Sequence, residues 1–327
     1  MPWPITFADV LSARERIRPH LSPTPLRSYA PLDAAVGGGI RVLVKHENHC
    51  PTGAFKARNG MAVMTSLTAE ERRRGVTAAT RGNHGAGLAW AGQIVGVSVT
   101  VCVPVGNNPE KNEAMRGFGA ELVEEGRDYD DAVEVADRLV EQRGLRLVHS
   151  TNEPQVLAGA ATISLELLEQ APELDAIVIA VGGGSQAVGA LTVARERRPG
   201  LRVYGVQAAG APAIHDSWHA GRIVEGASAS TFADGIATRK PPALTFPALK
   251  EGLAGFVRVD EGQIAAALRL LLRTTHNLAE GAGAAGLAGL FALREGLAGK
   301  TVAVIISGGN IDQDTLRRVL NRQVGEA

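Results

Sequence analysis

A lysine at position 56 lies in the segment Pro51–Arg58, which reads PTGAFKAR and surrounds it with small and apolar residues. These neighbours favour a partly buried amine. Burial disfavours the charged ammonium form and lowers the pKa of a lysine, which makes the neutral amine a nucleophile toward carbonyl carbon. Taken alone, Lys56 also fits a surface position at the start of a helix, which is the commoner case. Three further motifs along the chain favour the nucleophile.

The second motif is a run of small residues, Gly182, Gly183, Gly184 and Ser185, between an apolar stretch and a helical pattern. Glycines let backbone N–H groups converge on an anion, and the N-terminus of the following helix adds about half a positive charge. The run therefore predicts a phosphate site, to which Ser185 adds a hydroxyl. Its spacing is not G-x-G-x-x-G and no P-loop lysine follows, so dinucleotide and nucleoside triphosphate sites are disfavoured.

The third motif, Thr80–Gly85, reads TRGNHG and precedes the helical pattern of residues 86–95. Its glycines permit close approach of the backbone, and Thr80, Asn83 and the free N–H groups could hold a carboxylate or a phenolic oxygen. In isolation the segment fits an ordinary N-capped turn, and His84 fits a structural histidine.

A hydroxyl and an acid complete the set. Ser307 begins a Ser-Gly-Gly-Asn segment directly after the apolar run 301–306. Side chains at the carboxyl ends of parallel strands face the crevice where ligands of open α/β sheets bind, although Ser307 also fits a plain turn. Glu280 precedes a helical pattern rich in Ala and Gly within 279–297, where it fits equally a functional acid or an acid favoured by the helix dipole.

The elements that must position these residues alternate between short apolar runs and longer helical patterns, which predicts a doubly wound α/β fold. Strands are predicted at 41–45, 97–104, 145–148, 176–181, 201–206 and 301–306. Helices are predicted at 108–118, 128–143, 154–169, 186–197 and 261–275. The stretch 226–246 is the longest irregular region, and it fits either a loop near a site or plain surface.

Composition excludes several classes of protein. Lys plus Arg and Asp plus Glu both number 34, so a zero net charge offers no support for a nucleic-acid or membrane partner. The cysteines, Cys50 and Cys102, lie in or beside apolar stretches, which argues against a disulfide framework or a zinc cluster. The N-terminal residues do not resemble a signal peptide, and a cytoplasmic location is expected.

These motifs, in this order, resemble the fold type II pyridoxal-phosphate (PLP) enzymes, above all the serine/threonine dehydratases and serine racemases. The resemblance runs from Ser22–Leu26 (SPTPL) to Ser307–Asn310 and so covers nearly the whole chain. It implies two doubly wound α/β domains with PLP in the cleft between them, and a homodimer. We expect a large domain from 1–72 with 149–327, and a small domain at 73–148.

The resemblance also implies a role for each motif. Lys56 matches the Schiff-base lysine. The cofactor-binding residues implied are Phe55 on the ring, Asn83 at the phenolic oxygen, Gly182, Gly183, Gly184 and Ser185 at the phosphate, and Ser307 at the pyridine nitrogen. The implied substrate-binding residues are Thr80, Arg81, Gly82 and His84. The family usually has a fourth glycine where this chain has Ser185, and its A-D-G element matches Ala233–Gly235 on the substrate side.

The implied reaction is elimination of water from a 3-hydroxy amino acid such as threonine or serine, which gives a 2-oxo acid and ammonia. The freed Lys56 amine could remove the α-proton. A neutral Ser307 hydroxyl would not keep the pyridine nitrogen protonated, and this disfavours transamination. Racemases carry a serine where this chain has Arg81, and an arginine with a pKa above ~12 is a poor proton donor, so useful racemisation is not expected.

Other departures from the family concern the substrate and the metal. Ala54 and Ala86 replace the usual serine and glutamine, which suggests a bulkier substrate such as phenylserine, whereas Arg81 could instead pair with a second carboxylate, as in 3-hydroxyaspartate. The segment Val206–Ala213 lacks the carboxylates of the family's divalent-metal cluster, so no metal is expected. A β-replacement enzyme like cysteine synthase, a non-catalytic PLP-binding protein and a nicotinamide-dependent enzyme are the alternatives.

Overall fold

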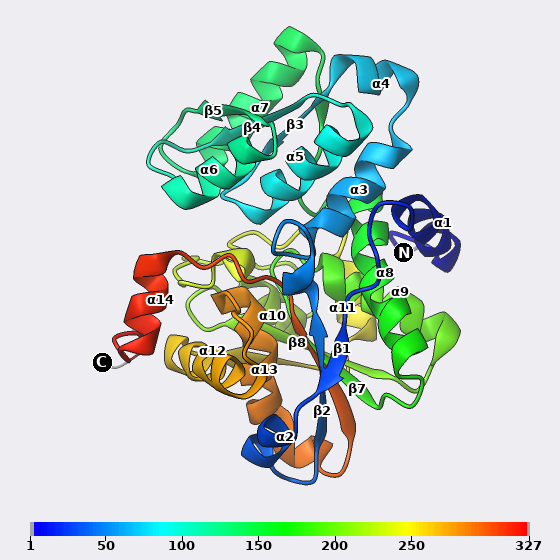
Figure 1. The fold of residues 1–327 in the computed structure, drawn as a ribbon, viewed down its shortest axis with the longest axis vertical. Coiled ribbons are helices and arrows are strands. Elements are labelled where there is room, and N and C mark those ends of the chain that lie inside the picture. The colour runs from blue at the N-terminus through cyan, green and yellow to red at the C-terminus, as the bar shows by residue number, and fades with distance from the viewer. Residues whose placement is uncertain (1–2, 326–327) are drawn as a thin grey trace.

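Residues 3–325, described by a computed structural model, form two separate β-sheets (Figure 1). The larger sheet has the strand order β1-β2-β10-β7-β8-β9, and its strands are parallel except β1, which runs antiparallel to β2. These strands are β1 (Leu26–Ser28), β2 (Arg41–His46), β7 (Ala176–Ala180), β8 (Arg202–Ala208), β9 (Gly255–Val259) and β10 (Thr301–Ile306). The smaller sheet is parallel throughout, in the order β5-β4-β3-β6. Its strands are β3 (Val76–Ala79), β4 (Val99–Val103), β5 (Glu121–Glu124) and β6 (Arg146–Leu147).

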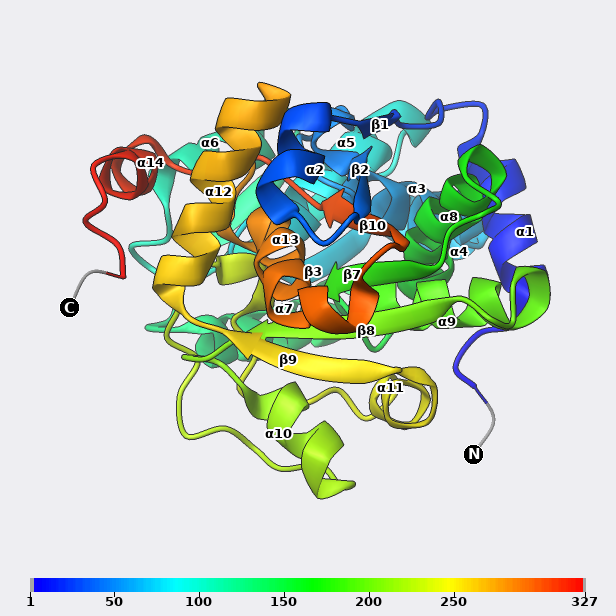
Figure 2. The ribbon, with the colours of Figure 1, turned by 90° about the horizontal axis from the view of Figure 1, so that it is seen from below.

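Helices cover both faces of each sheet. Around the larger sheet lie α1 (Phe7–Ile17), α2 (Ala30–Val36), α8 (Pro154–Gln170), α9 (Ser185–Arg197), α10 (Ala213–Ala220), α11 (Phe246–Gly252), α12 (Glu261–Thr275), α13 (Gly281–Leu293) and α14 (Gln313–Leu320). On the side of the smaller sheet lie α3 (Lys56–Ser66), α4 (Ala69–Arg74), α5 (Asn83–Val95), α6 (Pro109–Gly117) and α7 (Tyr129–Arg143). Short 3-10 helices are η1 (Glu47–His49), η2 (Asp234–Ile236) and η3 (Arg294–Leu297). Figure 2 shows β9 at one edge of the larger sheet, with α10 and α11 beside it.

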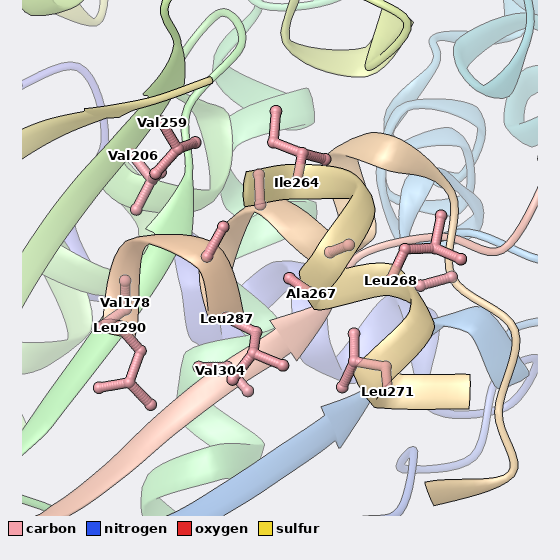
Figure 3. Close-up of a cluster of buried hydrophobic side chains, with 14 of the residues drawn as sticks. Val178, Val206, Val259, Ile264, Ala267, Leu268, Leu271, Leu287, Leu290 and Val304 are labelled. Carbon is pink, nitrogen blue, oxygen red and sulfur yellow. The ribbon is translucent and has the colours of Figure 1, made fainter. Parts of the chain in front are cut away.

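The strand β7 shows why both faces of the larger sheet are covered. Ala176 and Val178 pack into the cluster that includes α12 and α13, whereas Ile177 and Ile179 pack into the cluster that includes α8 and α9. Consecutive side chains of a strand point to opposite faces, so an unbroken apolar run suits a strand that is buried on both. Part of the first cluster, built by strands of the sheet together with α12 and α13, is shown in Figure 3.

Small residues let α13 lie close to the sheet. A Cβ atom on Gly286 would stand 3.0 Å from the carbonyl oxygen of Val178, and one on Gly289 would stand 2.2 Å from Cγ2 of Val206. The helical pattern rich in Ala and Gly within 279–297 thus corresponds to α13, which packs closely on the sheet. Within residues 3–325, no helix combines the length and the apolarity that crossing a bilayer requires.

The predicted α/β fold class is confirmed, and the predicted strands correspond to β2, β4, β6, β7, β8 and β10. The predicted helices correspond to α6, α7, α8, α9 and α12. The sequence pattern does not reveal β1, β3, β5 or β9. In β3 two alanines weaken the β-branched signal, and in β5 glutamates occupy both ends. The strand predicted at 145–148 shortens to Arg146–Leu147 at the edge of its sheet.

A buried group of charged side chains ties α3 to the larger sheet. The Arg58 guanidinium donates to both carboxylate oxygens of Glu47, at 2.7 and 3.0 Å, and to both of Glu166, at 2.6 and 2.8 Å. Lys45 Nζ lies 2.9 Å from Glu166 Oε2, so two cations face two anions. These residues belong to β2, η1, α3 and α8, and each is less than 9% exposed. They fix the first turn of α3, which begins at Lys56.

Replacing Arg58 by methionine should therefore strongly destabilise the fold, because two buried carboxylates would lose their main partner. We expect Arg58→Met to lower the free energy of unfolding by about 3–5 kcal/mol in urea denaturation. The control is Arg116→Met on the surface, where an exposed pair with Glu124 contributes within about 1 kcal/mol. An equally small effect of both changes would contradict the stabilising role of Arg58.

Candidate active site

The predicted site residues come together around one cavity with a volume of about 1450 Å³. Its lining includes Phe55, Lys56, Thr80, Arg81, Gly82, Asn83, His84, Gly182, Gly183, Gly184, Ser185 and Ser307. Elements of both sheets contribute, because Thr80 follows β3 of the smaller sheet and Ser307 follows β10 of the larger one. Much of the irregular stretch 226–246 lines the same cavity, so this stretch is a loop at the site.

The segment that carries Lys56 is pinned to the chain that follows β10. The Phe55 N–H donates to the Ser307 carbonyl oxygen at 2.9 Å, and the Gly309 N–H donates to the Gly53 carbonyl oxygen at 2.9 Å. Because β10 ends at the carboxyl edge of the larger sheet, these bonds place the start of α3 at that edge. Lys56 and the Ser307 side chain therefore reach the cavity from adjoining segments.

Lys56 is half-buried, and its amine lines the cavity. Its Nζ donates to the carbonyl oxygen of Ser150 over 3.5 Å and lies 4.8 Å from the ring centroid of Phe55. Burial lowers the pKa of Lys56 to about 8, although the negative charge of Glu280 opposes the shift. At pH 7 about a tenth of the amine is thus uncharged, far more than for an ordinary lysine, and the uncharged form is the one that acts as a nucleophile or a base.

The turn Gly182–Ser185 connects β7 to α9 and has no room for larger residues. A Cβ atom on Gly182 would stand 2.4 Å from the carbonyl oxygen of Gly235, and one on Gly183 would stand 2.0 Å from Thr151 Oγ1. Gly184 has a φ of 94° and precedes the first residue of α9, which has no side-chain cap. The N–H groups of that first turn are therefore free to bind an anion such as a phosphate.

One polar side chain at this turn escapes the sequence motifs. Gln186 is only 5% exposed and lines the cavity, and its side-chain oxygen and nitrogen have no hydrogen-bond partner among the described residues. A buried amide without partners costs free energy unless a ligand satisfies it. Gln186 therefore supports a polar ligand at the phosphate turn, and its only sequence signal is its place after Ser185.

The turn Thr80–His84 offers free N–H groups on the opposite side. Thr80 Oγ1 accepts a hydrogen bond from the Gly82 N–H at 3.0 Å, and α5 starts at Asn83 without a side-chain cap, so the N-capped turn is not formed. His84 Nε2 lies 3.1 Å from the Val148 carbonyl oxygen, which fixes the tautomer because a carbonyl only accepts. Arg81 is exposed at the rim.

Glu280 lies in the cavity and does not cap its helix. It precedes the first residue of α13 but makes no side-chain cap, and Asn83 Nδ2 donates to its two carboxylate oxygens at 2.8 and 3.1 Å. Glu280 thus stands at the start of α13 and also lines the cavity, so the dipole-favoured acid and the functional acid both stay open. An ion pair that the motifs do not reveal joins Lys111 Nζ of α6 to Asp234 Oδ2 of η2 at 2.7 Å. In the described part of the chain, His, Cys, Asp and Glu form no group arranged to hold a metal ion.

Comparisons with known proteins agree with this geometry. The family model described as "Pyridoxal-phosphate dependent enzyme" matches residues 17–308. The chain is 42% identical to L-threonine ammonia-lyase of Geobacter sulfurreducens over 285 residues, which are 87% of this chain and 71% of that protein. It is 31% identical to L-threo-3-hydroxyaspartate ammonia-lyase of Saccharomyces cerevisiae over 94% of each protein. The fold matches that of maize serine racemase with a TM-score of 0.92 and 28% identity, covering 98% of both chains.

The buried His84 should make the stability of the protein depend on pH. Burial, together with the nearby charge of Lys56, lowers the pKa of His84 to about 3, whereas an unfolded histidine has a pKa of about 6.5. Between these values the unfolded chain binds more protons, so the free energy of unfolding falls as the pH falls, by at most about 1.4 kcal/mol per pH unit.

We therefore expect His84→Gln to flatten the decline of unfolding free energy between about pH 6.5 and 4.5, relative to the unchanged protein. Urea denaturation at a series of pH values measures it. His20→Gln, on the exposed surface, is the matched control. If the curves for His84→Gln and the unchanged protein run parallel over this range, His84 is not a buried neutral histidine.

Proposed function

The chain belongs to the pyridoxal-phosphate dependent enzyme family and is a lyase that uses pyridoxal 5′-phosphate, and we propose that it eliminates water from threonine or a related 3-hydroxy amino acid. The products are a 2-oxo acid and ammonia. One observation carries the proposal: a half-buried lysine with a lowered pKa shares a cavity with an uncapped helix start, suited to an anion, and a turn of free N–H groups. These are the groups that the cofactor and an amino acid require.

The residues around the cavity fit the cofactor. We propose that Gly182–Ser185 and the start of α9 hold its phosphate, where the buried Gln186 also lacks a partner. Phe55 would lie against the ring, Asn83 would donate to the phenolic oxygen and Ser307 would face the pyridine nitrogen. When bound through Lys56, the cofactor supplies the electron sink that makes the α-proton of an amino acid acidic.

The chain itself contributes proton transfer, orientation and exclusion of water. The Lys56 amine, with a pKa of about 8, is suited to accept the α-proton near neutral pH. The free N–H groups of the turn Thr80–His84 are suited to hold the substrate carboxylate, which fixes the α-carbon relative to the amine. His84 stays neutral, so it adds no positive charge beside the Lys56 amine.

The test is ammonia release by the cofactor-loaded protein from a panel of L-threonine, L-serine, phenylserine and 3-hydroxyaspartate. We expect ammonia and a 2-oxo acid in equal amounts from at least one member, and none from Lys56→Ala, because the variant lacks the base. Added thiol should not enter the product. Efficient incorporation of the thiol without ammonia release would instead identify a β-replacement enzyme.

A second candidate substrate is 3-hydroxyaspartate, and Arg81 is the observation that favours it. Its exposed side chain lines the cavity and forms no ion pair with any described residue, whereas Lys111 beside the same turn is paired with Asp234. A relative of this chain acts on L-threo-3-hydroxyaspartate. An unpaired guanidinium could bind the second carboxylate of that substrate in a bidentate manner. Phenylserine, suggested by the small residues Ala54 and Ala86, stays a prediction.

If Arg81 binds a second carboxylate, Arg81→Ala should lower kcat/KM for 3-hydroxyaspartate about 10- to 100-fold through loss of a charged hydrogen bond. The value for threonine should change little, because threonine has no second carboxylate. Arg318→Ala, another cation of the cavity lining, serves as the control. Equal losses for the two substrates would remove Arg81 as a specificity residue.

We also propose the larger-scale organisation. The position of the smaller sheet between Val76 and Leu147 supports a small domain at 73–148, inserted between two parts of a large domain, 1–72 and 149–327. In this division α3 belongs to the large domain and packs against both α8 of that domain and α5 of the small one. A homodimer in the cytoplasm is part of the same proposal, and light scattering coupled to gel filtration would measure the mass in solution.

A further inference from the structure

A chain of hydrogen bonds with a defined direction ends at Glu280. The carbonyl oxygen of Thr52 accepts from Asn310 Nδ2 at 2.8 Å, and the same nitrogen donates to Asn83 Oδ1 at 2.8 Å. A backbone carbonyl can only accept, so Asn310 must present its nitrogen to Thr52 and to Asn83. Asn83 therefore presents its oxygen to Asn310 and its nitrogen to Glu280. The last member of the chain has to be an acceptor, which a carboxylate satisfies.

The carboxylate of Glu280 is held in place by its surroundings. The Glu280 N–H donates to the carbonyl oxygen of Gly308 at 3.0 Å, and a Cβ atom on Gly308 would stand 2.6 Å from Glu280 Oε1. Only a glycine fits at position 308 with the carboxylate in this place. Glu280 is 9% exposed and lines the cavity, so it faces the site from a fixed position.

Charged and titratable groups face Glu280 and Lys56 from several elements. Lys56 approaches from α3, Lys111 from α6 and Asp234 from η2, and all three interact electrostatically with Glu280. Burial raises the pKa of Glu280, and the positive charge of Lys111 opposes this shift. Burial lowers the pKa of Lys56, and the negative charge of Glu280 opposes that shift. His84 and His149 also interact electrostatically with Lys56, and burial lowers the pKa of both histidines, so they add little charge near neutral pH.

We propose that Glu280 is a positioning residue with two effects: its carboxylate holds the Asn83 amide nitrogen on the cavity side, and it places a negative charge in the cavity that the Lys56 amine also lines. Asn83 Nδ2 carries two hydrogens. If one of these N–H groups is shared between the two carboxylate oxygens of Glu280, the second N–H is left to donate to the phenolic oxygen of the cofactor. The identity of the cofactor rests on the proposed function. The effect of the Glu280 charge on Lys56 does not rest on the proposed function, because it acts in the protein without any substrate.

Two substitutions separate the charge of Glu280 from its role as an acceptor. Glu280→Gln removes the charge but can still accept a hydrogen bond from Asn83 through its amide oxygen. Glu280→Asp keeps the charge on a shorter side chain. The measurement uses the full-length protein freed of cofactor and labelled with trace acetic anhydride at a series of pH values. Mass spectrometry then gives the labelling of Lys56 relative to Lys250 of α11, which does not line the cavity and donates to the carbonyl oxygen of Gly221.

We expect Glu280→Gln to raise the relative labelling of Lys56 about 3- to 8-fold at about pH 6.5, because one unit of pKa corresponds to tenfold in the amine fraction. Glu280→Asp should stay within about twofold of the unchanged protein, since the charge is retained. Unchanged or slower labelling in Glu280→Gln would overturn the proposal, and so would equal acceleration in both variants.

A second readout uses the cofactor-loaded protein. The absorption band of the cofactor changes with pH, and the midpoint of this change should shift in Glu280→Gln but not in Glu280→Asp. If Glu280 were merely structural, the substitutions would change the melting temperature and leave this midpoint unchanged. Labelling needs no turnover, so the two proposals fail separately. A protein that labels as expected but releases no ammonia supports the role of Glu280 and contradicts the proposed elimination.

Discussion

Partial burial of the Lys56 amine is the constraint on which the rest of the site depends. A fully hydrated lysine is charged at neutral pH and is neither a nucleophile nor a base, whereas burial lowers the pKa of Lys56 to about 8. That burial requires the start of α3 to be held tightly. Two sets of contacts hold the start of α3 in place: the backbone hydrogen bonds to the segment after β10, and the buried ion pairs of Arg58 with Glu47 and Glu166. The chemistry of one amine thus depends on charges two residues further along the same helix.

The fold could be predicted where local sequence alone determines structure. Alternate side chains of the apolar strand β7 pack into two different hydrophobic clusters. The Ala- and Gly-rich helix α13 packs where larger residues would collide with Val178 and Val206. By contrast, β3 and β5 are short and carry alanine or glutamate, so their pairing in the smaller sheet decides their structure. Tertiary pairing is not visible in a local pattern.

The same distinction applies to the site. The Gly182–Ser185 turn and Ser307 could be predicted because each directly follows an apolar strand at the carboxyl edge of the larger sheet. Lys56 could be predicted because small and apolar residues surround it in the sequence. The connection from Asn310 through Asn83 to Glu280, and the pair Lys111–Asp234, join residues that are 123 to 227 positions apart in the chain. No spacing rule reports such contacts, because they form only when elements of the two sheets meet across the cavity. Gln186 could not be predicted as a site residue either, since only its burial without a hydrogen-bond partner among the described residues distinguishes it.

The central claim is that the Lys56 amine forms the covalent link to pyridoxal phosphate. The most direct measurement is reduction of the cofactor-loaded protein with borohydride, followed by digestion and mass spectrometry of the peptide that contains Lys56. The account predicts a phosphopyridoxyl group on Lys56 and its loss in Lys56→Ala. A reduced adduct on another lysine, such as Lys111 in the same cavity, or no adduct at all, would contradict it.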